Sequence, residues 1–134
     1  MTYRYSTQRL DTNFRTTTTR ITAAVGLVRG DLCYMNSSGK MDKADASVTT
    51  TAETMLGIAT EPIAANKEGM FALWGMFDTT GLTIGILYVS TTAGTWSSTT
   101  PTAINEIVRV IGYATSATEL YFSPDRTWIE LNVT

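Results

Sequence analysis

The sequence predicts an all-β fold: a small sandwich or barrel built from two related β units, with an extended N-terminal arm. Short runs rich in β-branched and aromatic residues recur along the chain, and turn-forming residues separate them. A glycine pattern repeated 55 positions further on predicts the two units. The 134 residues suffice for one sizeable core, so we expect an arm over residues 1–20 and a single β domain over residues 21–134.

The arm is polar and threonine-rich and has no helical or alternating apolar periodicity. Residues 1–30 hold five arginines and one aspartate, whereas the remainder holds five basic and eleven acidic residues. We therefore expect the arm to bind an acidic partner through ion pairs and aromatic anchors, with a solvated tail as the alternative. Nucleic acid is not favoured, because the acidic body would repel a polyanion. The residues predicted to bind are Tyr3, Arg4, Tyr5, Arg9, Leu10, Phe14, Arg15 and Arg20.

Seven runs of the remaining chain are predicted to form strands. They cover residues 31–35, 54–60, 69–77, 83–89, 106–114, 119–122 and 127–133. In the last run Ile129, Leu131 and Val133 alternate with polar residues and Trp128, which predicts a strand with one buried face. The spacing of the runs is typical of a sandwich or barrel.

The run "GMFALWGMF" at residues 69–77 is apolar on both faces of a strand. A small domain has difficulty covering both faces internally, so we expect one face to pack against another subunit. The predicted interface consists of Met70, Phe71, Leu73, Trp74, Met76 and Phe77. The alternative is a central strand that is covered on both faces within one chain.

An internal repeat supports the two β units. Gly26, Leu27, Gly30, Leu32, Gly39, Gly57, Ala59 and Thr60 match Gly81, Leu82, Gly85, Leu87, Gly94, Gly112, Ala114 and Thr115 at one offset. The units are predicted at about residues 26–80 and 81–134. All eight glycines are expected at structural turns, where Gly30 and Gly85 need positive φ or a close backbone approach.

The same repeat helps to interpret the tripeptide Arg29-Gly30-Asp31, which matches a sequence that adhesion receptors bind. In the second unit Ile84 and Ile86 replace the two charged residues, while the glycine persists. We therefore interpret the tripeptide as a turn and not as an adhesion site, since three-residue motifs often match by chance.

Composition argues against catalysis. The chain contains no histidine, which is the commonest general base and metal ligand, and its one cysteine, Cys33, lies in an apolar run where we expect a small buried hydrophobe. We expect no enzyme activity, no metal and no cofactor. No apolar run is long enough to cross a membrane as a helix, and we expect synthesis in the cytoplasm without a membrane partner.

Residues 26–77 resemble the body of bacteriophage capsid decoration proteins, also called cement or head-stabilising proteins, including the lambda-type family. The resemblance lies in a Gly-Asp-hydrophobic strand, a polar turn, an Ala/Thr-rich loop and two later strands. These are Gly30-Asp31-Leu32, residues 36–39, 44–54, 56–59 and 69–77. Residues 81–131 are similar to segments of phage virion proteins, with a Gly-Tyr-Ala strand followed by Leu-Tyr-Phe-Ser-Pro.

The resemblance implies a structural virion protein that binds the capsid exterior, often as a homotrimer, and clamps adjacent major capsid protein subunits. In this chain the apolar strand at 69–77 would supply a dry interface, and the arm would reach a neighbouring subunit by strand addition. The alternative is a head- or tail-fibre module that binds a receptor. In such a module Trp96 and Trp128 are candidates for stacking on sugar rings.

Overall fold

The computed structural model describes residues 16–132, and among them it is almost entirely β-structure. This confirms the all-β class that the sequence predicts. One short 3₁₀ turn, Thr49–Thr51, interrupts the strands. The strands are β1 (Thr16–Thr22), β2 (Leu32–Met35), β3 (Met41–Lys43), β4 (Leu56–Ala59), β5 (Glu68–Asp78), β6 (Gly85–Val89), β7 (Trp96–Ser97), β8 (Ile107–Val108), β9 (Val110–Ser116), β10 (Glu119–Phe122) and β11 (Ile129–Glu130).

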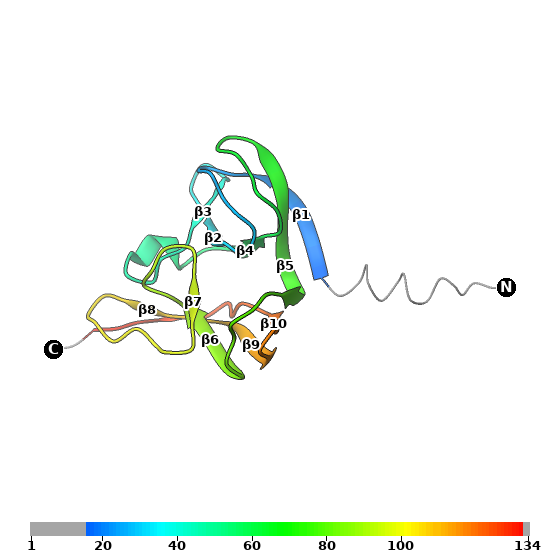
Figure 1. The fold of residues 1–134 in the computed structure, drawn as a ribbon. Coiled ribbons are helices and arrows are strands. Elements are labelled where there is room, and N and C mark those ends of the chain that lie inside the picture. Colours follow the sequence, from blue (N-terminus) through cyan, green and yellow to red (C-terminus); the bar gives the residue numbers. More distant parts are fainter. Residues whose placement is uncertain (1–15, 133–134) are drawn as a thin grey trace.

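Nine of these strands form one antiparallel sheet, in the order β3-β2-β4-β5-β10-β9-β6-β7, with β1 paired to β5. The order is symmetric about the β5–β10 pair. The first half, residues 16–80, contributes β3-β2-β4-β5, and the second half, residues 81–132, contributes the same arrangement as β7-β6-β9-β10. This is the order that two related β units joined edge to edge would give. Figure 1 shows the two halves curled toward each other from the long strand β5.

The glycines of the repeat serve two structural purposes. Six of the eight have positive φ: Gly30, Gly39, Gly81, Gly85, Gly94 and Gly112. Gly57 and Gly112 lie within β4 and β9 and not in turns, and at both positions a neighbouring group approaches closely. A Cβ at Gly112 would collide with the carbonyl oxygen of Tyr121, and one at Gly57 would lie 2.9 Å from Cε of Met41. Gly26 has neither a positive φ nor a close neighbour at its Cβ position, and the turn role predicted for it stays a prediction.

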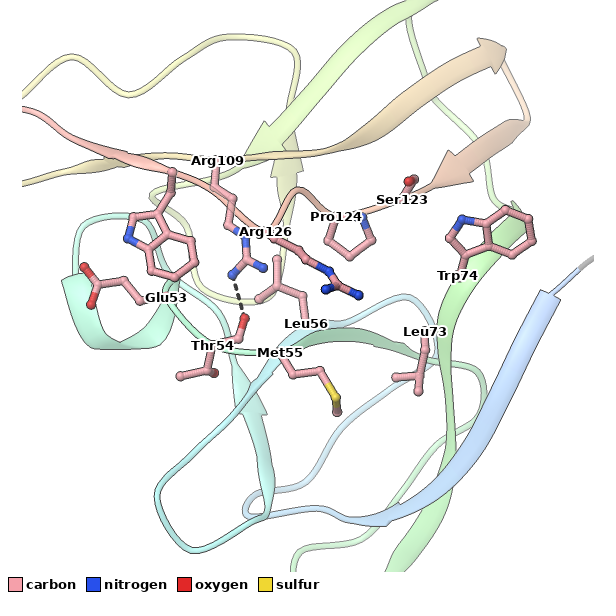
Figure 2. Close-up of a pocket in the computed structure, with 11 residues that line it drawn as sticks. Glu53, Thr54, Met55, Leu56, Leu73, Trp74, Arg109, Ser123, Pro124 and Arg126 are labelled. Atoms are coloured by element: carbon pink, nitrogen blue, oxygen red, sulfur yellow. Dashed lines mark hydrogen bonds between the residues drawn. The ribbon is translucent and has the colours of Figure 1, made fainter.

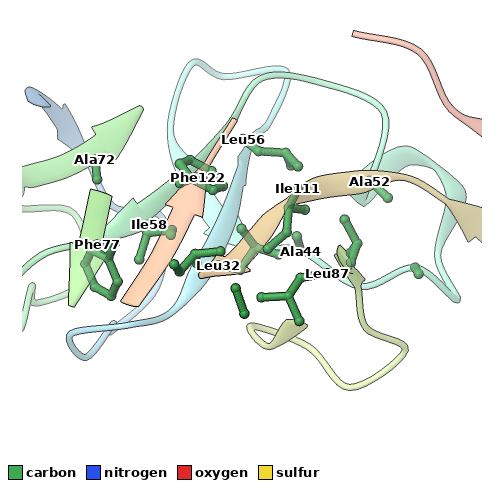
Figure 3. Close-up of a cluster of buried hydrophobic side chains, with 14 of the residues drawn as sticks. Leu32, Ala44, Ala52, Leu56, Ile58, Ala72, Phe77, Leu87, Ile111 and Phe122 are labelled. Atoms are coloured by element: carbon green, nitrogen blue, oxygen red, sulfur yellow. The ribbon is translucent and has the colours of Figure 1, made fainter. Parts of the chain in front are cut away.

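Most of the buried apolar side chains lie in a shared core between the two halves (Figure 3). The first half supplies Leu32, Ala44, Ala46, Ala52, Leu56, Ile58, Ala72 and Phe77, and the second supplies Leu87, Val89, Ile107, Ile111, Ala114, Leu120 and Phe122. Because every member is less than one-tenth exposed, this core holds the curled sheet closed.

A second, smaller cluster lies on the opposite face of the first half. We call it the covered cluster, and it consists of Ala23, Leu27, Cys33, Met41, Ala59, Ile63 and Phe71. Neighbouring strand residues point to opposite faces, so Phe71 enters this cluster while Ala72 enters the shared core. The first part of β5 is therefore covered on both faces within one chain, which was the alternative to a subunit interface.

Part of the predicted arm belongs to the sheet. β1 pairs with β5 from Thr16 opposite Gly75 to Thr22 opposite Glu68, so residues 16–20 are a strand. After β1, Ala23 forms a parallel bridge with Met41 of β3, which ties the segment across the first half. Residues 1–15 lie outside the described residues.

Two predicted strands differ from those observed. The run at 106–114 is interrupted at Arg109, which separates β8 from β9. The run at 127–133 is reduced to β11, and Ile129 is exposed, so the buried face expected there is wrong. The two residues of β11 pair only with β8, outside the main sheet.

Candidate interaction surface

A row of apolar side chains crosses four neighbouring strands, on the outer face of the second half and the adjoining end of β5. Ile86 on β6 pairs with Tyr113 on β9, Tyr113 pairs with Tyr121 on β10, and Tyr121 pairs with Met76 on β5. Directly opposed residues of antiparallel strands place their side chains side by side on one face. We call these four residues the outer row.

Trp74 extends the outer row at its β5 end. Its ring meets that of Tyr121 edge to face, with 5.8 Å between the ring centroids. Trp74 is 48% exposed, Ile86 46% and Tyr113 45%, whereas Tyr121 and Met76 are half-buried. Exposed apolar side chains gathered in this way are typical of protein interaction sites, and Trp and Tyr are the residues that most often anchor them.

Alternation along the strands explains why these side chains face outward. Leu87, Ala114, Leu120 and Phe77 each follow or precede a member of the outer row by one residue, and all four lie in the shared core. Since successive side chains of a strand point to opposite faces, burial of these four directs the outer row away from the core.

The predicted interface residues are divided between the interior and the surface. Trp74 and Met76 belong to the exposed side of the molecule, and Met70 and Leu73 are half-buried on β5. Phe71 and Phe77 are buried in the chain's own cores, so their assignment to a subunit interface is wrong.

Sequence reasoning missed three members of the outer row, Ile86, Tyr113 and Tyr121. The signal that could have found them is the alternation in "ILYV", "GYA" and "ELYF". In each run the residue next to a core residue in the sequence points to the other face of the strand. The cross-strand register that joins them into a row is a long-range property.

The predicted binding arm joins the sheet beside the outer row. Tyr3, Arg4, Tyr5, Arg9, Leu10, Phe14 and Arg15 lie outside the described residues, and Arg20 is exposed on β1 opposite Met70. Thr16, the first described residue, lies opposite Gly75, and its hydroxyl donates to the carbonyl of Met76. The first described residue of β1 therefore lies next to the β5 end of the outer row.

The charged side chains of Arg29-Gly30-Asp31 make contacts within the protein itself. Nη2 of Arg29 donates to the carbonyl of Asp78 over 2.8 Å, and the guanidinium lies 4.5 Å from the centroid of the Phe77 ring. Oδ2 of Asp31 accepts the N–H of Val28 over 2.9 Å. Gly30 itself has a φ of 97°. The contacts of Arg29 fasten the turn to the end of β5, and the bond between Val28 and Asp31 closes the turn itself, which agrees with the turn interpretation.

The two tryptophans proposed for sugar stacking have different surroundings. Trp96 is half-buried against the shared core, with its ring edge to face with Phe77 at 6.4 Å between centroids. Trp128 is 38% exposed, and the guanidinium of Arg109 lies 5.0 Å from its ring centroid. Only Trp128 therefore presents much of its ring to solvent.

Cys33 has the character expected of a small buried hydrophobe. Its side chain lies in the covered cluster, and burial, with smaller contributions from Asp31 and Asp42, raises the pKa of the thiol to about 12. The thiol therefore stays protonated at neutral pH and is a poor nucleophile.

No group of three or more Cys, Asp or Glu side chains within residues 16–132 is arranged to hold a metal ion. Over the same residues, no helix is long and apolar enough to cross a membrane. Compared with known proteins, the chain matches no family model and no curated sequence.

Proposed function

We propose that this chain is a structural protein of a bacteriophage virion that binds the outer surface of the capsid and stabilises the shell by clamping adjacent major capsid protein subunits. The observation that carries the proposal is the exposed outer row beside the start of β1. A clamp needs two contacts on one rigid body. The outer row offers an apolar contact, and the basic residues 1–15, which precede β1 in the sequence, would offer a second contact.

The two contacts would contribute in different ways. Burial of apolar surface contributes about 25 cal/mol per Å², so the outer row would supply the dry part of the interface. The arginines of residues 1–15 would pair with carboxylates of a neighbouring subunit, a contribution that salt weakens. Repetition of the clamp around a closed shell multiplies a modest affinity through avidity.

Self-association belongs to the same proposal. The resemblance to decoration proteins implies a homotrimer, and the outer row is apolar enough to form part of a contact between copies. No catalytic step is needed, because the protein would act only by holding subunits together.

The test is binding to phage heads that lack this protein. The full chain, a chain without residues 1–15, and a Tyr113→Ser/Tyr121→Ser variant are added to such heads, and bound copies per head are counted after sedimentation. The deletion stops at residue 15 because residues 16–22 form β1. Full chain is expected to saturate the heads and to delay release of DNA on heating, and each variant is expected to bind at least about tenfold more weakly.

The outcome that contradicts the proposal is absence of saturable binding by the full chain. Binding of the full chain to host cells instead of heads would favour the alternative, a receptor-binding fibre module. The exposed ring of Trp128 is the observation that favours that alternative, so a Trp128→Ala variant is included in the cell-binding assay.

A further inference from the structure

A pocket lies where the two halves of the sheet diverge from β5. β4 pairs with Phe71 and Ala72, and β10 pairs from Gly75 onward, so Leu73 and Trp74 lie between the two strands. The pocket measures about 640 Å³, which is within the range of ligand-binding sites. Figure 2 shows that its walls come from both halves of the chain. We call it the fork pocket.

Arg109 is the buried charged group of the fork pocket. It is only 5% exposed. Its Nε donates to the carbonyl of Asp125 over 2.9 Å, and its Nη1 donates to the carbonyls of Ala52 and Thr54 over 3.0 and 2.6 Å. These bonds join a loop of the first half to the segment that follows β10, and Figure 2 shows the bond to Thr54.

The guanidinium of Arg109 has N–H groups that are not used in these hydrogen bonds. It carries five N–H groups, and the bonds from Nε and Nη1 account for three of them. Within residues 16–132 no acceptor is bonded to Nη2. Buried donors in proteins are nearly always paired, so two unpaired N–H groups beside a pocket indicate a place for an acceptor from outside.

The charge of Arg109 also lacks direct neutralisation, because all three of its acceptors are backbone carbonyls. Burial lowers the pKa of Arg109, and the nearby Asp125 carboxylate opposes this effect. A guanidinium nevertheless keeps its proton in proteins. Exposed Arg126 adds a second positive charge to the lining, against the one carboxylate of Glu53.

Apart from the hydroxyl residues Thr54 and Ser123, the rest of the lining is apolar or aromatic. It includes Met55, Leu56, Leu73, Pro124 and the two tryptophans Trp74 and Trp128. Arginine, tryptophan and methionine are the residue types enriched at the centres of protein interfaces. A phosphate or a nucleic acid backbone would leave these apolar walls without a partner, whereas a peptide with mixed side chains would cover them.

We propose that the fork pocket binds a polypeptide segment in which an acidic side chain is flanked by apolar ones. The carboxylate accepts from Nη2 of Arg109 and from Arg126, and the flanking apolar side chains pack on Leu73 and Trp74. This inference does not depend on the proposed function, since the same segment chemistry occurs in many partner proteins.

The test uses a short blocked peptide, acetyl-Gly-Leu-Glu-Leu-Gly-amide, and the same peptide with Gln in place of Glu. Each is titrated into the ¹⁵N-labelled full chain while the three tryptophan indole N–H signals are followed by NMR. Trp74 and Trp128 line the pocket and are expected to shift in a saturable way, whereas Trp96 packs against Phe77 elsewhere and serves as the internal control. The Glu peptide is expected to bind with a dissociation constant of about 1 mM, and the Gln peptide about tenfold more weakly.

Two variants sharpen the result. Arg126→Gln changes an exposed residue and is expected to keep the fold while weakening the Glu peptide about fivefold. Lys67→Gln removes an exposed charge outside the pocket and is expected to leave binding unchanged. Equal binding of the Glu and Gln peptides, shifts that include Trp96 as strongly as Trp74, or no shift up to about 10 mM would each overturn the proposal.

Discussion

The two halves of the sheet have the same strand order, but the outer face is covered in the first half and exposed in the second. In the first half, the neighbours Ala59 and Phe71 are buried in the covered cluster. In the second half, Tyr113 and Tyr121 occupy the matching pair of strands and belong to the exposed outer row. Both pairs lie on the face turned away from the shared core, so the halves differ in what lies over that face.

The cover of the first half comes from two connecting segments. Leu27 and Ile63 exchange backbone hydrogen bonds of 2.8 and 2.9 Å, and both side chains pack in the covered cluster. Ile63 lies in the long connection between β4 and β5, at residues 60–67. The equivalent connection between β9 and β10 has only two residues, 117 and 118, and is too short to supply such a cover. Loop length therefore decides which half buries its own outer face and which half leaves it exposed.

The largest expected effect separates a covered side chain from an exposed one. Phe71→Ala empties a fully buried site in the covered cluster and is expected to lower the free energy of unfolding by about 3–5 kcal/mol. Tyr113→Ala, on the matching face of the second half, is expected to change it by less than about 1 kcal/mol. Urea unfolding followed by circular dichroism measures both. Similar losses for the two variants would show that the outer faces do not differ as described.

A second comparison concerns the glycines that frame the two units. Gly112→Ala places a Cβ against the carbonyl of Tyr121 at a positive φ, so we expect a loss of about 2 kcal/mol in unfolding free energy. Gly26→Ala is the matched control, since a Cβ there meets nothing within 4 Å. Its effect is expected to stay within about 0.5 kcal/mol. An unchanged unfolding free energy in Gly112→Ala would mean that β9 and β10 can move apart at this position without loss of stability.

A smaller effect is expected at the turn that carries charged residues in the first half but not in the second. Arg29→Ala removes the bond to Asp78 and the contact with the Phe77 ring, which together should contribute about 1 kcal/mol. Ile84, the matching residue of the second half, is exposed, and Ile84→Ala is expected to leave stability within about 0.5 kcal/mol of the parent. Thermal unfolding of the two variants measures the difference. An adhesion role for Arg29 would instead appear as lost cell binding at unchanged stability.

The sequence allowed the fold class and the repeat spacing to be predicted, because strand alternation and turn glycines are local signals. It did not allow the buried face of β5 to be chosen, since "GMFALWGMF" is apolar on both faces. The choice depends on Leu27 and Ile63, which reach Phe71 only through the tertiary fold. The position of Arg109 within an apolar run likewise gave no sign of its bonds to Ala52 and Thr54, 55 or more residues earlier.

The smallest expected change in stability comes from the outer row itself, and it is the most informative about the comparison. An Ile86→Ser/Tyr113→Ser variant alters two side chains that are nearly half exposed, so the unfolding free energy should move by no more than about 1 kcal/mol. If another chain supplies the cover that the second half lacks, the same variant should lose self-association or partner binding by at least about tenfold. A Val28→Ser/Val48→Ser variant, which changes exposed residues away from the outer row, is the matched control and should lose neither. Sedimentation velocity across a concentration series measures self-association. Self-association and binding to phage heads that are both unchanged in the Ile86→Ser/Tyr113→Ser variant would mean that the second half is stable with its outer face open to solvent. Loop length would then explain the fold without implying a partner.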